Sequence, residues 1–303
     1  MAKAVQFRGV TRAFEEHIVI QDVSLDIYEN EVLGLIGGNG SGKTTLLELM
    51  AGVLRPTLGS IKMQLSGTDV RDVYRNRAEA KKYLGFGLQS PSFYPSMTVQ
   101  ENVAYFSSLH CMEDTSTESY RSELLNRLRL ADKTDIVAHR LSGGMKKRLD
   151  IACATVHQPR YIFLDEPASD LDPELRSTVW DVITWFAEKG ATVVFSTHYL
   201  DELQSFTDRV AVLQRGRLEE VKTPDQLHAE VNTNVIIELG LDDADRRAVL
   251  NALQEFSVVS EEPVMVEAAH PTHVFQSLSH NELLDCVELV NTKRDGLASL
   301  IHE

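Results

Sequence analysis

A phosphate-binding loop near the start of the chain constrains its fold more than any other feature. Residues 37–44 read Gly-Gly-Asn-Gly-Ser-Gly-Lys-Thr and fit the pattern G-x-x-x-x-G-K-[ST]. An apolar run over residues 32–36 precedes the loop, and apolar residues at helical spacing follow it as far as Gly52. A strand, a glycine-rich loop and a helix in this order predict an α/β fold that binds a nucleotide.

The residues of this loop suit a triphosphate. Glycines let successive backbone N–H groups converge on phosphate oxygens at the start of a helix, where the helix dipole favours an anion. Lys43 can reach the outer phosphates, and the Thr44 hydroxyl can ligate Mg²⁺. The predicted ligands of this loop are therefore a nucleotide and Mg²⁺. The nucleotide-binding candidates in this segment are Gly37, Gly38, Asn39, Gly40, Ser41, Gly42, Lys43, Thr44 and Thr45.

A second apolar run, over residues 161–164, ends in two carboxylates, Asp165 and Glu166. A buried strand that ends in this way delivers both acids to the carboxyl edge of a sheet, where ligands bind in open α/β folds. Asp165 can hold Mg²⁺ directly or through water, and Glu166 can polarise a water for attack on the γ-phosphate. An Asp-Glu pair alone is usually a solvated strand end, so its pairing with the phosphate loop carries the catalytic interpretation.

A second Ser-Gly-Gly loop, at residues 141–145, opens a predicted helix and offers another set of phosphate contacts. One nucleotide site needs only one such set. With the phosphate loop and the acidic strand end, this loop completes an ordered series of motifs, and residues 3–228 resemble the nucleotide-binding subunit of an ATP-binding cassette (ABC) protein. The resemblance implies that Ser142, Gly143 and Gly144 contact ATP held by another subunit, so that two subunits sandwich two ATP molecules head to tail.

The resemblance implies further roles that the residues alone do not show. Phe14 stands where the family stacks an aromatic ring on adenine, and Gln89 matches the glutamine that contacts Mg²⁺ and the attacking water. His198 matches the switch histidine, which would bind the γ-phosphate and position that water for Glu166. Asp172 lies in a segment similar to the family's D-loop. Taken singly, a phenylalanine, a loop glutamine or a strand-end histidine has an ordinary structural interpretation.

Composition excludes several other classes. The formal charge of −15 argues against general affinity for nucleic acid or anionic lipid, both of which favour basic patches. The sequence has no apolar run long enough to cross a bilayer and no signal-like N-terminus. Its three cysteines lie too far apart for a metal site, and an odd number gives no disulfide framework. We therefore expect a cytoplasmic subunit, held on the membrane face through a partner.

Two domains are expected. Residues 1–230 form the ATPase domain, a P-loop α/β core with an antiparallel β-subdomain over residues 3–28 and a helical subdomain over about residues 95–145. In the family, this subdomain forms the groove for a transmembrane partner, and Phe93, Tyr94 and Met97 are either groove or packing residues. Residues 113–118 are expected to be a loop.

Residues 231–303 are expected to form a small α+β accessory domain. Its predicted elements are strands near residues 235–239, 264–267 and 287–290, a helix over residues 243–255 and a terminal helix.

These expectations favour an ATP-hydrolysing subunit that dimerises on ATP, as a homodimer or with a second ABC ATPase, and powers a separate transmembrane partner. Met145, where many members carry glutamine, and the C-terminal extension favour an export-type system. The alternative is a non-transport ABC ATPase that acts in DNA repair, translation, assembly or regulation. Long coiled coils, tandem cassettes or basic surfaces are typical of that class, and this acidic chain with a single cassette shows none in its sequence. No feature of the sequence indicates which substrate is transported.

Overall fold

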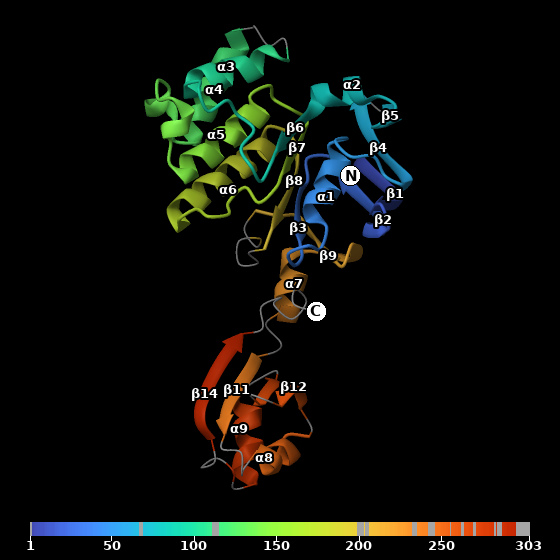
Figure 1. The fold of residues 1–303 in the computed structure, drawn as a ribbon, viewed down its shortest axis with the longest axis vertical. Helices are drawn as coiled ribbons and strands as arrows, with labels where there is room; N and C mark the ends of the chain where they lie inside the picture. Colours follow the sequence, from blue (N-terminus) through green and yellow to red (C-terminus); the bar gives the residue numbers. More distant parts are fainter. Residues whose placement is uncertain are drawn as a thin grey trace. The chain divides into compact units, whose positions relative to one another are not determined.

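The structure is a computed structural model (Figure 1). It describes residues 2–66, 69–110, 115–198, 203, 206–231, 235–241, 246–254, 256–261, 264–268, 271–281, 283 and 287–294. The chain divides into two compact units, Met1–Thr223 and Pro224–Glu303. This division lies before helix α7 (Pro224–Val231), whereas the sequence placed the boundary after residue 230.

A six-stranded sheet forms the centre of the first unit. Its order is β10-β9-β3-β8-β7-β6, and all neighbours are parallel except the antiparallel pair β9 and β10. The strands are β3 (Val32–Ile36), β6 (Leu84–Gly87), β7 (Tyr161–Leu164), β8 (Thr192–Thr197), β9 (Arg209–Gln214) and β10 (Arg217–Lys222). Every residue of β3, β7 and β8 is buried, as expected for parallel strands covered on both faces. The carboxyl ends of β3, β7 and β8 therefore meet at one edge.

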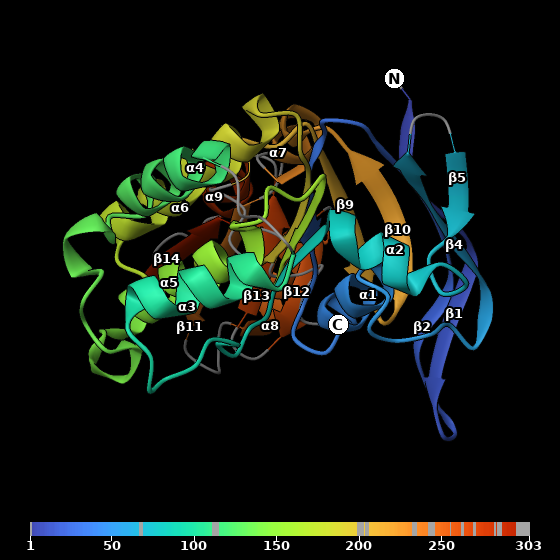
Figure 2. The same cartoon turned by 90° about the horizontal axis from the view of Figure 1, so that it is seen from above.

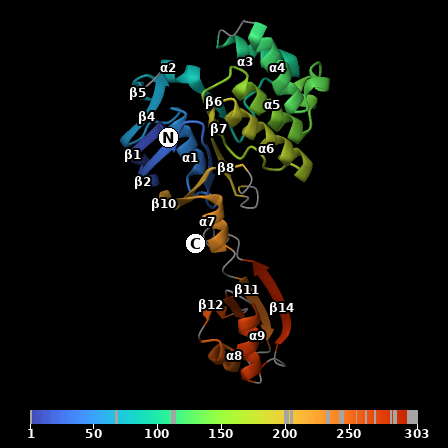
Figure 3. The ribbon, with the colours of Figure 1, turned by 180° about the vertical axis from the view of Figure 1, so that it is seen from behind.

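Helices cover both faces of this sheet (Figures 1 and 3). Helix α1 (Lys43–Met50) lies on one side, and α5 (Gly143–Thr155) and α6 (Pro173–Glu188) lie on the other. Helix α1 stops at Gly52, whose φ of 69° is the left-handed conformation that glycine adopts most readily. The Val53 N–H then donates to the Glu48 carbonyl at 2.9 Å, which closes the helix end. This ending fixes the length of the helix that the phosphate loop opens.

A second, antiparallel sheet forms a layer beside α1 (Figure 2). Its order is β2-β1-β4-β5, with strands β1 (Lys3–Phe14), β2 (His17–Tyr28), β4 (Leu58–Ser66) and β5 (Asp69–Asp72). Alternate residues of β1 and β2, such as Val5, Phe7 and Ile27, are fully buried in one core with α1. The β-subdomain predicted for residues 3–28 is therefore larger than expected, because β4 and β5 extend it.

The helical subdomain contains α3 (Val99–Ser108), α4 (Thr115–Arg127) and the start of α5. A capping box starts α3, since Thr98 accepts from the Glu101 N–H and the Glu101 carboxylate accepts from the Thr98 N–H. The loop expected over residues 113–118 was partly wrong: Thr115 begins α4, and the acidic Glu118 in its first turn favours a helix start. Residues 113 and 114 lie outside the described part of the chain.

After α7, the second unit has the element order β-α-β-β-α-β, which is the ferredoxin-like arrangement. Its antiparallel sheet has the order β12-β13-β11-β14. The elements are β11 (Val235–Leu241), α8 (Arg246–Ala252), β12 (Ser257–Glu261), β13 (Val264–Ala268), α9 (Pro271–His280) and β14 (Val287–Arg294). Ile237 and Val266 on the strands pack in one core with Val249 of α8 and Val274 of α9. The expected strands are present, whereas β12 and α9 had not been predicted and the expected terminal helix lies outside the described residues.

Among the described residues, none of the helices combines the length and the apolar character that a bilayer crossing requires.

Candidate nucleotide-binding and hydrolysis site

The phosphate loop joins β3 to α1 and is held by its own lysine. Lys43 Nζ donates to the carbonyl oxygens of Gly37 at 2.8 Å and Gly38 at 3.0 Å, and the residue is 6% exposed. Burial lowers the pKa of the Lys43 ammonium, while the charges of Glu166 and Asp165 oppose that shift. A buried cation whose hydrogen bonds go to two carbonyl oxygens is suited to exchange these contacts for phosphate oxygens.

Asp165, at the end of β7, contacts the start of α1. The Thr44 hydroxyl donates to Asp165 Oδ2 at 2.7 Å, and the Ser196 hydroxyl of β8 donates to Oδ1 at 2.6 Å. Asp165 is only 3% exposed. Two of the three residues predicted to hold Mg²⁺, Thr44 and Asp165, are thus adjacent, with oxygen ligands of the type that this ion prefers. Ser196 was missed from the sequence, where nothing distinguishes it from an ordinary strand serine.

Glu166 has an unusual backbone conformation. Its φ of 47° is rare for a residue with a side chain and marks a position held by its surroundings. Its N–H donates to Ser196 Oγ at 2.8 Å, and its carbonyl accepts from the N–H and the hydroxyl of Ser169 at 3.2 and 3.0 Å. Glu166 Oε2 lies 3.2 Å from His198 Nδ1. The predicted base and the predicted switch histidine are therefore in contact.

A cavity of 240 Å³ collects the predicted residues around the loop. Its lining residues are Val19, Asn39, Gly40, Gly42, Lys43, Thr44, Thr45, Gln89 and Glu166. The hydroxyl of Ser41 is buried without a hydrogen-bond partner among the described residues, and a Cβ on Gly40 would meet open space. An unpaired donor and free space beside the loop fit a phosphate group. Val19 of β2 had not been predicted, because a lone apolar strand residue carries no binding signal.

The remaining predicted residues lie outside the lining of this cavity. The Phe14 ring is 41% exposed, with the Arg12 guanidinium 4.3 Å from its centroid. Ser142 is the N-cap of α5, where its hydroxyl accepts from the Met145 N–H at 3.3 Å. Asp172 caps α6 in the same way. The loop at residues 142–144 and the phosphate loop thus do not share one cavity.

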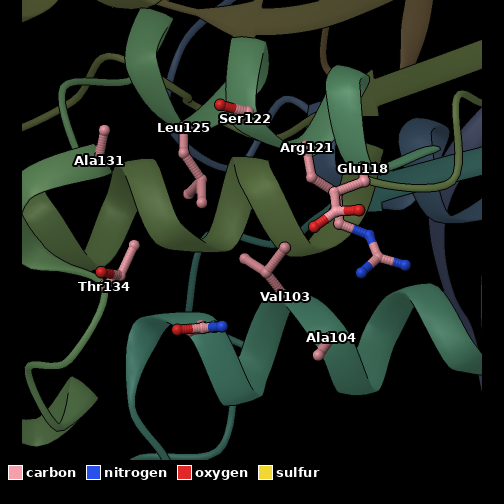
Figure 4. Close-up of a pocket in the computed structure, with 9 residues that line it drawn as sticks. Val103, Ala104, Glu118, Arg121, Ser122, Leu125, Ala131 and Thr134 are labelled. Carbon is pink, nitrogen blue, oxygen red and sulfur yellow. The ribbon is translucent and has the colours of Figure 1, made fainter. Parts of the chain in front are cut away.

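A second cavity, of 280 Å³, lies between α3 and α4 in the helical subdomain (Figure 4). Val103 of α3 and Leu125 of α4 face one another across it (Figure 4). Its lining contains none of the predicted nucleotide or metal residues. Of these two cavities, the one at the phosphate loop contains the predicted nucleotide and metal residues.

Comparisons with known proteins identify the family. The family model described as ABC transporter matches residues 20–169. The Nod factor export ATP-binding protein I of Burkholderia lata is 32% identical over 268 residues, which are 88% of this chain and 86% of that protein. The chain belongs to the ABC transporter family. It is the ATPase subunit of such a transporter, and subunits of this kind associate with transmembrane partners.

One further relative and two solved structures are similar to this chain. The probable multidrug ABC transporter ATP-binding protein YbhF of Escherichia coli K12 is 32% identical over 226 residues, or 75% of this ABC ATPase and 38% of that protein. A solved ATP-binding subunit of an ABC transporter has a TM-score of 0.68 at 23% identity and covers 75% of this chain and 92% of its own. The cbiO1 subunit of Clostridium perfringens has a TM-score of 0.65 at 24% identity, over 84% of this chain and 97% of its own. These structures support the ABC fold.

Proposed function

We propose that this ABC ATPase binds MgATP at the phosphate loop, hydrolyses it with Glu166 as the base, and powers export through a separate transmembrane partner. The observation that carries the proposal is the convergence of four side chains from three segments. Thr44 contacts Asp165 at 2.7 Å, and Glu166 contacts His198 at 3.2 Å, at neighbouring ends of β7 and β8. The relatives include proteins named as export ATP-binding proteins, which favours export as the direction of transport.

The proposed chemistry divides among these residues. Lys43 releases the carbonyls of Gly37 and Gly38 and binds phosphate oxygens, together with the N–H groups of the loop. Mg²⁺, held by Thr44, Asp165 and Gln89, would neutralise phosphate charge. Glu166 accepts a proton from the attacking water. His198, in contact with the Glu166 carboxylate, orients that water.

The loop at residues 142–144 supports a dimer. It opens a helix of 13 residues, whose N-terminus favours an anion, yet it lies outside the lining of the loop cavity. We therefore assign its nucleotide contact to the ATP of a second subunit, either another copy or a related ABC ATPase, with Asp172 beside that interface. Arg12 covers one face of the Phe14 ring, and the ring would stack on adenine with its other face.

An aromatic surface next to the Gln89 loop suits the transmembrane partner. Tyr94 is 43% exposed, and its ring packs edge to face on Tyr105 with centroids 4.9 Å apart. Phe93 is 7% exposed and packs the subdomain, so only part of the expected groove lies on the surface. Exposed aromatic residues are typical of interface centres. This surface would hold the subunit on the cytoplasmic face of the membrane, and the unit from Pro224 onward is an accessory domain.

The test is the variant Glu166→Gln in purified protein. We expect ATP binding to be retained while turnover falls roughly 10²–10⁴-fold, since the amide cannot accept the proton. An ATP-dependent dimer should accumulate in size-exclusion chromatography. Glu174→Gln is the matched control, because the Glu174 side chain is 76% exposed and lies at the start of α6. Wild-type turnover by Glu166→Gln would remove Glu166 from the mechanism.

The transport assignment has its own test. Affinity purification from detergent-solubilised membranes should recover a polytopic protein with the subunit, and Tyr94→Glu should reduce that recovery. Recovery of ribosomal or DNA-associated proteins alone would contradict the assignment.

A further inference from the structure

Lys147 of helix α5 contacts the segment that follows Glu166. Its Nζ donates to Ser169 Oγ at 2.9 Å. The Ser169 hydroxyl donates in turn to the Glu166 carbonyl at 3.0 Å, and the Ser169 N–H donates to the same oxygen at 3.2 Å. One hydroxyl thus accepts from the lysine and donates to the glutamate backbone, so the lysine sets the direction in which Ser169 points its proton.

The charges around Lys147 point to the same segment. Lys147 is partly buried, and burial lowers the pKa of its ammonium. The negative charge of Glu166 opposes this shift most strongly, and Asp150, Asp165 and Asp170 oppose it less. A partly buried cation among carboxylates resists displacement, since its removal would leave like charges facing one another. Lys147 is therefore a fixed positive charge beside the catalytic acids.

Glu166 needs such support because of its backbone. A side-chain-bearing residue at φ 47° adopts a strained backbone conformation, which persists only where its surroundings hold it. Ser196 holds the N–H of Glu166, and Ser169 holds its carbonyl. Loss of the second anchor would let the backbone relax and carry the carboxylate away from His198.

We propose that Lys147 is a positioning residue for Glu166, which acts through Ser169 to keep the carboxylate aligned for proton transfer. The inference rests on the proposed role of Glu166 as base. It also connects two half-sites in one chain, because Lys147 lies on the helix that begins with Gly143 and Gly144. When those glycines contact the nucleotide of a second subunit, helix α5 would thus transmit the effect of this contact to Glu166 of the first subunit.

The experiment compares Lys147→Met with Lys146→Met, its neighbour on the same helix. We expect Lys147→Met to lower kcat roughly tenfold to a hundredfold, as expected for a small misplacement of a reacting group, while KM for ATP changes less than about twofold. Lys147→Arg should restore part of kcat, because the guanidinium can still donate to Ser169. Lys146→Met should leave kcat near the wild-type value.

Double variants separate this role from a structural one. Ser169→Ala should lower kcat like Lys147→Met, and the combination should be no worse than either change alone, since both act on one contact. If Lys147→Met instead lowers Tm together with ATP binding, or multiplies the effect of Ser169→Ala, the positioning role is overturned. Glu166→Gln separates the two proposals. If it is inactive while Lys147→Met has wild-type kcat, only the inference on Lys147 fails; if it keeps wild-type turnover, the proposed base and this inference fail together.

Discussion

The Thr44 hydroxyl donates a 2.7 Å hydrogen bond to Oδ2 of Asp165, although 121 residues separate the two in the chain. The contact forms because β3 and β7 both flank β8, so that the loop after β3 and the end of β7 reach the same sheet edge. The Ser196 hydroxyl of β8 holds the other oxygen of Asp165. The carboxylate is therefore oriented before any cation or nucleotide enters, and little side-chain entropy remains to be lost when they bind.

The first prediction concerns this carboxylate. Asp165→Asn should leave nucleotide binding in EDTA within about threefold of wild type while abolishing most of the gain that Mg²⁺ gives, because a neutral amide is a poor ligand for this ion. Binding of a fluorescent ATP analogue, titrated with and without Mg²⁺, measures both quantities. Asp181→Asn, at an exposed position on α6, is the matched control. Equal gains from Mg²⁺ in variant and wild type would contradict the assignment of Asp165.

The second prediction uses the two glycines that open α5. A Cβ added to Gly143 would meet nothing within 4 Å of its own chain, whereas one on Gly144 would lie 3.0 Å from Leu171 Cδ2 and 3.1 Å from Leu175 Cδ1. Gly143→Ala should therefore leave the free energy of unfolding unchanged or raise it by up to about 1 kcal/mol, since alanine favours a helix. It should still reduce ATP-dependent dimerisation at least about tenfold, because the added methyl group enters the space proposed for the second subunit's nucleotide.

Gly144→Ala is the informative comparison for that prediction. It should lower the free energy of unfolding, since the leucine side chains at 3.0 and 3.1 Å must move. Chemical denaturation and analytical ultracentrifugation with ATP measure the two effects separately. Normal dimerisation by Gly143→Ala would mean that the free space around this glycine has no role in binding.

Motif residues could be placed from the sequence because their chemistry fixes their local structure. The loop at residues 37–44 demands a strand before it and a helix after it, and Asp165 demands a strand end, so β3, α1 and β7 followed. Ser196, Val19 and Lys147 could not be found in this way. Their roles come from pairing between distant segments, and a serine, a valine or a helical lysine has many ordinary positions.

Surface and packing roles were also beyond the sequence. Phe93 and Tyr94 are adjacent aromatic residues with the same expected role, yet the first is 7% exposed and the second 43%. Only the position of the backbone relative to α3 decides which ring turns inward. Likewise, the polar residues at the start of α4 suit both a loop and a helix N-terminus, so composition alone favoured the wrong one.

The third prediction concerns Tyr94 and Tyr105, whose rings pack at 4.9 Å on the proposed docking surface. Tyr94→Ala should lower partner-stimulated ATPase activity several-fold, because exposed aromatic rings contribute strongly to interface affinity. Basal ATPase activity of the isolated subunit should stay within about twofold of wild type. Reconstitution with the co-purified membrane protein in vesicles gives both rates. Val70→Ala, an exposed apolar position on β5, controls for general surface effects. Equal stimulation of Tyr94→Ala and wild type would contradict the docking role.

The fourth prediction is a pH effect on stability from the stacked rings of His110 and His157, whose centroids are 3.6 Å apart. Burial, with a smaller effect from His110, lowers the pKa of His157 from 6.5 to about 4, and its Nε2 contacts the Leu84 carbonyl at 2.9 Å. A depressed folded-state pKa means that stability is fully present above the unfolded value of 6.5 and is lost as pH falls toward about 4, because only the unfolded chain takes up the proton. From pH 7 to pH 5, the first unit should lose about 2 kcal/mol through this group. His157→Gln should remove that part of the pH dependence in urea unfolding. His139→Gln, a change at an exposed position, is the control and should keep it. If the free energy of unfolding of His157→Gln still fell with pH as in wild type, the buried ring would not carry the effect.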